Sequence, residues 1–168
     1  MDVPCITIQT KKQGGNMDTN KITRIAIVST LYVVLTVINP FSYETIQFRI
    51  SEILMFLCLY KKEYVISLTI GCLISNFFSP MVLYDIAFGT TATLLAGILM
   101  YKTKNIYIST LYPILTNTIL VGIELSIVYN TPFLINAAWV LLGEAVVMII
   151  GLIIFLSLRK KEIFKKMI

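Results

Sequence analysis

Four acidic residues lie within or at the edge of segments that are otherwise apolar: Glu52, Asp85, Glu124 and Glu144. A carboxylate accepts hydrogen bonds and pairs with cations. An ionised acid at the centre of a membrane helix costs about 2.5–3.5 kcal/mol on insertion scales, so each of these acids is expected to have a partner. Arg49 alone cannot balance four carboxylates. The surplus negative charge indicates a ligand that is cationic or rich in N–H donors.

Two amide residues, Asn76 and Asn117, occur in the same kind of segment. They are candidates for contacts with a ligand, and interhelical hydrogen bonding is the alternative role for each. Arg49 and Glu52 are three residues apart, so on one helix face they could also neutralise each other. Glu144 is the strongest single candidate, because no basic residue of the apolar segments is left to pair with it.

The composition of the chain favours lipid as its main surroundings. Of its 168 residues, 57% are hydrophobic and only 14% are charged, and the mean hydropathy is +0.84. Soluble domains are roughly half apolar and about a quarter charged. The chain has no histidine, which excludes histidine-based metal sites and Ser-His or Cys-His catalysis. Neither a cofactor nor a metal is expected.

Six apolar segments predict an all-α integral membrane protein with six transmembrane helices, since about 20 apolar residues cross a bilayer. The second segment is short, and a start at Thr45 or a tilted or partly extramembrane helix are alternatives for it. The predicted spans are Ile22–Asn39, Phe48–Tyr60, Tyr64–Phe78, Leu83–Tyr101, Ile106–Tyr129 and Phe133–Leu158. Residues 21–168 would form one domain, preceded by a disordered polar tail over residues 1–20.

The basic residues alternate with these spans in a way that fixes an orientation. One side of the membrane would hold 13 of the 14 Lys and Arg residues, and the other would hold Arg49 alone. By the positive-inside rule both termini are predicted to be cytoplasmic, in a multi-pass protein of the plasma membrane. The 13 are Lys11, Lys12, Lys21, Arg24, Lys61, Lys62, Lys102, Lys104, Arg159, Lys160, Lys161, Lys165 and Lys166.

With this topology the polar groups gather in the outer half of the membrane. Asp85 begins the fourth span at its outer end, Glu124 lies near the outer end of the fifth, and Glu52 lies in the outer half of the second. Glu144 is deeper, about 17 Å along the sixth span at 1.5 Å per residue. Such a distribution predicts a pocket open to the outside and closed beneath by apolar packing.

The loop between the first two spans carries Phe41, Tyr43, Glu44 and Gln47. Aromatic residues at this level often form only an interfacial belt, but here they flank the predicted pocket, so the loop is a candidate gate over a flat ligand. Trp139, the only tryptophan, lies five residues before Glu144. It is a candidate ligand contact, and an interface anchor is the alternative.

The chain has no P-loop, nucleophile elbow or HExxH motif, so it is not expected to hydrolyse ATP or to be an enzyme. It also lacks the internal repeat of many secondary transporters. A partner that supplies energy is therefore an attractive hypothesis. Ala26 and Thr30, spaced for close helix approach, lie near the cytoplasmic end of the first span. Packing within the protein is the default interpretation of this spacing, and contact with such a partner is the alternative.

Several runs of residues resemble the QueT family. The run 47–54, QFRISEIL, is similar to that family's QFR(V/I)SEAL segment. The runs GCLISN at 71–76 and DIAFGTTATL at 85–94 resemble its GxxIxN and D…FGxxATL patterns. The resemblance covers roughly residues 21–159, and it includes charged and amide positions as well as apolar ones.

The resemblance implies a substrate-binding S component of an energy-coupling factor (ECF) transporter for queuosine precursors, which are 7-deazaguanine bases. It further implies partnership with a transmembrane coupling protein and two ATPases, and a loaded subunit that topples in the membrane to release its ligand. The family's small-residue coupling motif would be Ala26 and Thr30 here, with threonine in place of the second alanine. No nucleic-acid partner is expected.

The expected substrate contacts combine both lines of reasoning: they are Arg49, Glu52, Asn76, Asp85, Glu124, Trp139 and Glu144. A guanine-like face offers adjacent N–H donors to a carboxylate, and an aminomethyl group adds a cation. Two alternatives stay open. One is an S component for another vitamin-like or purine ligand, and the other is a membrane accessory protein whose acids pair with partner helices.

Overall fold

The computed structural model describes residues 19–44, 46–103 and 105–159, and within these ranges the chain forms helices and no strands. The predicted tail lies outside the described residues, except for Thr19 and Asn20, which begin the first helix. The elements are α1 (Thr19–Ile38), η1 (Pro40–Tyr43), η2 (Ile50–Leu59), α2 (Lys62–Asn76), α3 (Val82–Tyr84), η3 (Asp85–Gly89), α4 (Thr90–Lys102), α5 (Ile106–Tyr129) and α6 (Phe133–Arg159).

Four helical stretches of the described chain are long and apolar enough to cross a membrane. They are Thr19–Ile38, Val82–Lys102, Ile106–Tyr129 and Phe133–Leu158. These match four of the six predicted spans to within a few residues. The other two segments are the 15-residue α2 and the 10-residue η2, which are shorter than a standard span. The six-span count therefore stays a prediction.

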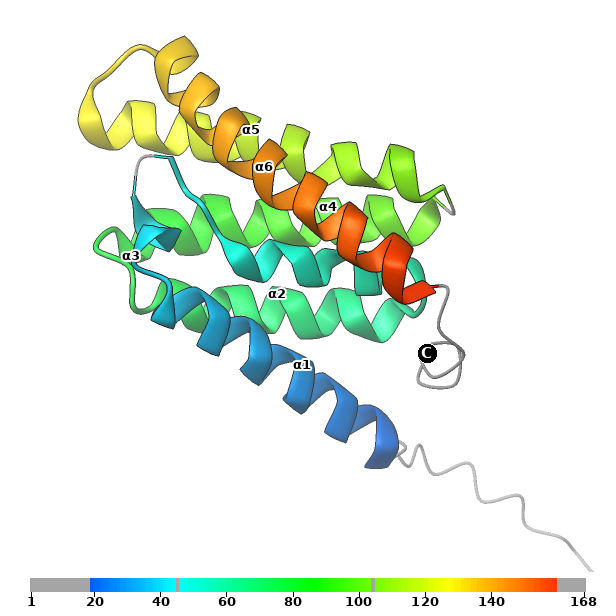
Figure 1. Ribbon diagram of the computed structural model, residues 1–168. Coiled ribbons are helices and arrows are strands. Elements are labelled where there is room, and N and C mark those ends of the chain that lie inside the picture. Colours follow the sequence, from blue (N-terminus) through cyan, green and yellow to red (C-terminus); the bar gives the residue numbers. More distant parts are fainter. Residues whose placement is uncertain (1–18, 45, 104, 160–168) are drawn as a thin grey trace, which may run out of the picture.

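The long helices run alongside one another, and their connections gather at two opposite ends (Figure 1). One end holds the end of α1, the start of η2, and the connections at 77–81 and 130–132, and we call it the loop end. The other holds the connection at 60–61, the end of α4 and the start of α5, and we call it the lysine end after Lys61 and Lys102. The first residue of α1 and the last of α6 also lie at the lysine end (Figure 1).

The short η2 segment is a 3-10 helix at the centre of the bundle. It contacts α1, α2, α4, α5 and α6. A 3-10 helix rises about 2.0 Å per residue against 1.5 Å for an α-helix, so its ten residues cover about 20 Å instead of 15 Å. The extended residue Arg49 before it adds further length. The greater rise per residue lets this short segment span more of the length of the surrounding helices.

The stretch 82–102 is one continuous helix with a wider turn inside it. Residues Asp85–Gly89 adopt π-helical geometry between α3 and α4, where the backbone N–H of Thr90 donates to the carbonyl of Asp85. Single π turns inside α-helices occur frequently at functional sites. Here the wide turn lies at the loop end, where it carries Asp85.

An apolar core occupies the part of the bundle toward the lysine end. Five of its large members are fully buried: Met55, Phe56, Leu68, Met100 and Met148. The rings of Phe56 and Phe155 pack with their centroids 5.2 Å apart. Toward the loop end the same helices carry polar side chains, beside a smaller apolar cluster of Val121, Leu125 and Val140.

Candidate functional site

The first part of the polar cluster is an ion pair between Arg49 and Asp85. The guanidinium Nη2 lies 2.8 Å from Asp85 Oδ1, and both side chains are almost fully buried. Arg49 Nε donates to the Ser42 carbonyl at 3.1 Å. The Ser79 hydroxyl donates to the other carboxylate oxygen of Asp85. Both oxygens of Asp85 are thus already engaged by protein groups.

This pairing corrects one interpretation of the sequence, in which Arg49 neutralised Glu52 across a helix face. Arg49 is the N-cap of η2 (φ −89°, ψ 96°), and its carbonyl accepts from the Glu52 N–H at 3.0 Å. Its guanidinium, however, pairs with Asp85, and no ion pair with Glu52 occurs among the described residues. Because Asp85 comes from η3, the pair joins two segments 36 residues apart.

Asn76 lies next to this pair, at the end of α2. Its amide nitrogen donates to the Asp85 carbonyl at 2.7 Å and to Thr90 Oγ1 at 3.2 Å. Gly89 permits this approach, since a Cβ there would lie 3.2 Å from Asn76 Nδ2 and 3.4 Å from Arg49 Nη1. The amide oxygen of Asn76 is buried and has no hydrogen-bond partner in the described part of the chain. Asn76 therefore has an acceptor to offer.

Glu52 and Glu144 are each held by one neutral donor. The Tyr32 hydroxyl donates to Glu52 Oε1 at 2.6 Å, and Asn117 Nδ2 donates to Glu144 Oε1 at 2.7 Å. In both cases the second carboxylate oxygen, Oε2, is buried and has no partner among the described residues. In each acid, the hydrogen bond at one oxygen fixes the orientation of the carboxylate, and the other oxygen remains available as an acceptor.

Glu124 on α5 differs from the other three acids. Its side chain is 0% exposed, and neither carboxylate oxygen has a hydrogen-bond donor within the described ranges. The four acids are all buried, and together with Arg49 and Asn76 we call them the acid cluster.

The segment of residues 39–49, leaving out residue 45, closes the loop end over this cluster, and we call it the α1–η2 loop. Asn39 Nδ2 donates to the Phe48 carbonyl at 2.6 Å, and the Phe48 N–H donates to the Phe41 carbonyl at 3.1 Å. These bonds hold the two limbs of the loop together. Gln47 has φ of 48°, a value uncommon for a residue other than glycine, and its side chain is buried.

Two contacts tie the α1–η2 loop to opposite sides of the bundle. The Tyr43 hydroxyl donates to the Ser75 carbonyl of α2 at 2.6 Å. Burial raises the pKa of the Tyr43 phenol, which therefore keeps its proton at neutral pH and remains a donor. On the other side, the Ile46 carbonyl packs directly on Gly143 of α6, where a Cβ would overlap it. Gly143 is the residue next to Glu144.

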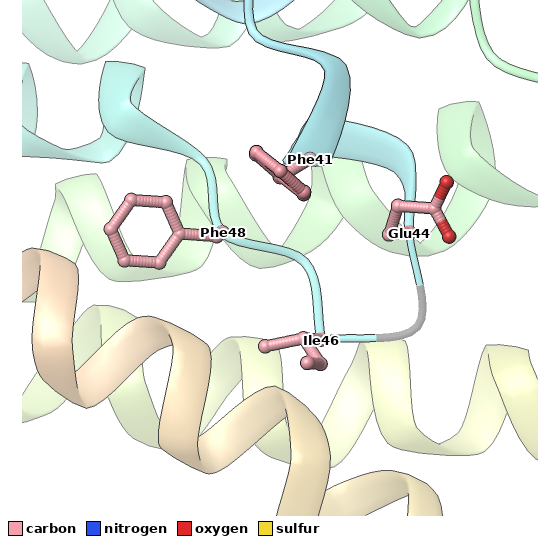
Figure 2. Close-up of a pocket in the computed structure, with 4 residues that line it drawn as sticks. All are labelled: Phe41, Glu44, Ile46 and Phe48. Carbon is pink, nitrogen blue, oxygen red and sulfur yellow. The ribbon is translucent and has the colours of Figure 1, made fainter.

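Phe41, Glu44, Ile46 and Phe48 line a pocket of about 610 Å³ on this loop (Figure 2). Phe41 and Glu44 come from one limb of the loop, and Ile46 and Phe48 come from the other (Figure 2). The lining is mostly apolar and includes a single carboxylate. Phe41 is 62% exposed, so this pocket lies at the surface, whereas the acids of the cluster are buried.

The remaining predicted site residues lie on the exterior. Trp139 is 45% exposed on α6, unlike Glu144, which is 1% exposed. Ala26 and Thr30 lie on the exposed face of α1 and line a groove of about 450 Å³ together with Ile27, Leu31 and Val34. The structure thus gathers Arg49, Glu52, Asn76, Asp85, Glu124 and Glu144 in the interior and leaves Trp139 at the surface.

Three contributors to the site were not predicted from the sequence: Tyr32, Ser79 and Gly143. Tyr32 is completely buried in α1, where its ring alone would suggest a core residue, and its hydroxyl holds Glu52. Ser79 lies in a turn beside a proline. Gly143 precedes Glu144, and a glycine directly before a buried acid was the one available signal of a close backbone approach.

These features define a class: an all-helical membrane protein with an enclosed, acid-rich cluster at one end of its bundle and a loop closing over it. The family model of the QueT transporter matches residues 22–160, so the chain belongs to the QueT transporter family. It is 36% identical over 162 residues to the queuosine precursor transporter QueT of Lactococcus lactis subsp. cremoris (strain MG1363), covering 85% of this chain and 94% of that protein. No solved structure gives a significant match.

Proposed function

We propose that this chain is the membrane-embedded, substrate-binding S component of an ECF-type transporter that imports a queuosine precursor, a 7-deazaguanine base. The observation that carries the proposal is the set of buried carboxylate oxygens without donors on Glu52, Glu124 and Glu144. A buried acceptor without a donor costs roughly 1–3 kcal/mol, and more when it is charged. A ligand with several N–H groups would recover this energy, and the L. lactis relative is named for such a ligand.

In this proposal some residues of the cluster bind the ligand and others position the surrounding backbone. Glu144 Oε2, Glu52 Oε2 and the Asn76 amide oxygen are free acceptors that suit the N–H donors of a deazaguanine ring. Arg49 and Asp85 are committed to each other, and we assign them to positioning the α1–η2 loop and the π turn. The exposure of Trp139 favours the interface-anchor role for that residue.

The α1–η2 loop would act as the gate of the site. All four acids are at most 1% exposed, so a ligand can reach them only after something moves. Two contacts hold the loop to α2 and α6, at Tyr43 and at Ile46, and a third holds it to Arg49, whose Nε donates to the Ser42 carbonyl. Release of these contacts would free the loop ahead of Arg49 without unfolding a helix, while Arg49 stays paired with Asp85. The apolar pocket beside Phe41 would then receive the flat ring first.

For the membrane topology, we propose six spans with both termini in the cytoplasm and a single domain over residues 21–168. The described connections alternate between the loop end and the lysine end, as six spans require (Figure 1). Lys61, Lys62 and Lys102 lie at the lysine end, which the positive-inside rule assigns to the cytoplasm. The loop end, with the acid cluster, would then face outward.

The α1 groove would contact the transmembrane coupling protein, which works with two ATPase subunits. The groove is lined by Ala26 and Thr30, whose small side chains allow another helix to approach closely. The neighbouring side chains Ile27, Leu31 and Val34 are apolar and exposed, which suits either lipid or a partner helix. The chain would supply binding, and the ATPases would supply energy.

Calorimetry on the purified protein tests this function directly. We expect binding of 7-aminomethyl-7-deazaguanine and exclusion of guanine. The Glu144→Gln variant should bind about 10–100-fold more weakly, because a hydrogen bond to a charged group contributes about 1.5–3 kcal/mol. The matched control is Glu63→Gln, which removes a carboxylate paired with Arg24 on α1 and α2, outside the cluster.

The outcomes separate the competing functions. Folded wild-type protein that binds neither compound would refute the proposed substrate. If Glu144→Gln binds normally but no longer assembles with partner subunits, the accessory-protein interpretation is correct instead. Equal losses in Glu144→Gln and Glu63→Gln would show that affinity reports general stability and not contact with the ligand.

A further inference from the structure

We propose that Glu124 recognises a positively charged amine of the ligand and so sets the preference for an aminomethyl substituent over a neutral one. The inference rests on the proposed function and assigns a separate role to one acid within the same site. It follows from a difference among the four carboxylates in the donors that the protein gives them.

The four carboxylates differ in how many of their oxygens accept a hydrogen bond from the protein. Asp85 has a donor at each oxygen, from Arg49 and Ser79. Glu52 and Glu144 each have a donor at one oxygen. Glu124 has none at either oxygen, as far as the described residues extend, although it is completely buried. The unmet demand for donors and positive charge is therefore greatest at Glu124.

The arginine of the cluster does not meet this demand. No ion pair among the described residues includes Glu124, and Arg49 is already paired with Asp85 at 2.8 Å. That pair has no net charge, so it leaves Glu124 without a counter-ion of its own. A buried carboxylate is tolerated when it is both paired with a cation and hydrogen-bonded. An ammonium group provides the charge and three N–H donors in one small group.

Glu52 and Glu144 suit a different part of the ligand. Each is oriented by a neutral donor, Tyr32 or Asn117, and presents one free oxygen. A fixed single acceptor matches the N–H edge of a planar ring, whose donors point in set directions. Glu124, with both oxygens free, suits the rotating ammonium of a side arm. Glu52 and Glu144 would thus bind the ring, and Glu124 would bind the amine.

Calorimetry with three ligands tests this assignment: 7-aminomethyl-, 7-hydroxymethyl- and 7-cyano-7-deazaguanine. The last two keep the ring and lack the positive charge. Wild-type protein should bind the aminomethyl compound about 10–100-fold more tightly than either, the range expected for one charged hydrogen-bonding contact. In Glu124→Gln this preference should fall to within about threefold, with little change for the neutral ligands, a difference worth less than 1 kcal/mol.

Glu144→Gln is the matched comparison, and it should weaken all three ligands by similar factors. Glu124→Gln that weakens all three equally, or none, overturns the assignment. A wild-type protein that binds the hydroxymethyl compound as tightly as the aminomethyl compound also overturns it, and this measurement does not depend on whether the variant folds. If wild-type protein binds no deazaguanine, the proposed function itself fails, and this assignment with it.

Discussion

Toward the lysine end of the bundle, Met55, Phe56 and Met148 fill the space between the helices, whereas at the loop end the same helices carry Glu52, Asn76 and Glu144. The first set is complete by itself, because apolar side chains need only close packing. The second set leaves buried oxygens without donors. The apolar end thus needs no further partner, whereas the polar end has acceptors that the proposed ligand would satisfy.

Removing the central arginine should break the loop end most severely. Arg49→Met leaves Asp85 buried without its cation, and loss of one partner of a buried ion pair costs about 3–5 kcal/mol. We expect a large fall in the unfolding midpoint of the detergent-purified protein. The double variant Arg49→Met/Asp85→Asn should recover much of it. A single variant as stable as wild type would show that the pair is not essential to the fold.

A substitution toward the lysine end should lower the stability of the protein without changing the acid cluster. Met148→Ala removes a fully buried side chain from the apolar core, and cavities of this kind typically cost about 2–5 kcal/mol. The expected value is near the lower limit, because lipid also solvates the unfolded side chain. Thermal unfolding measures the loss, and ligand affinity should stay within about threefold, less than 1 kcal/mol. Ile149→Ala, at a 53% exposed neighbour, is the control and should change stability little.

The contact between the α1–η2 loop and α6 can be tested with a matched pair of substitutions. α6 has one glycine beside the loop and another beside the apolar core, and each can be changed to alanine. Gly143→Ala places a methyl group against the Ile46 carbonyl, so the α1–η2 loop must shift, at a cost of about 1–3 kcal/mol. Gly151→Ala on the same helix meets the Phe56 ring instead. Hydrogen exchange in residues 39–49 should rise only in Gly143→Ala. A similar rise in both variants would contradict the local role of Gly143.

The smallest effect is expected at the other attachment of the loop. Tyr43→Phe removes the bond to the Ser75 carbonyl, which contributes about 0.5–1.5 kcal/mol. Amide hydrogens of the α1–η2 loop should exchange about two- to tenfold faster, as this energy implies. Tyr84→Phe removes a hydroxyl from an exposed tyrosine at the same end and is the control. Unchanged exchange in Tyr43→Phe would place the loop's attachment elsewhere.

The sequence predicted the features that depend on composition and length. The four long apolar helices are as expected. The four acids were predicted to line a pocket open to the outside, but in the structure they are at most 1% exposed, because the α1–η2 loop lies across this end of the bundle. Local backbone geometry was not predictable in the same way. The 3-10 conformation of Ile50–Leu59 arises because a ten-residue segment must extend through a bundle of longer helices, a tertiary constraint that no local pattern reveals.

The partners within the site also escaped prediction, for a related reason. Arg49 and Glu52 could have formed an i, i+3 ion pair, but the guanidinium pairs instead with Asp85, which is 36 residues away in the sequence. The contacts of Glu52 with Tyr32 and of Glu144 with Asn117 join separate helices, and sequence spacing does not determine which helices are neighbours. The sequence therefore predicted which polar residues belong to the site, but it did not predict which of them contact one another.

The closed position of the α1–η2 loop has a consequence for the time course of binding. With every acid of the cluster at most 1% exposed, a ligand cannot associate at the rate of a simple collision with an open site. The observed association rate should rise with ligand concentration and then level off at the rate of loop opening, and the apparent affinity is reduced by the fraction of time the loop is closed. Under the proposed gating, a ligand bound beneath the loop would leave no faster than the loop opens.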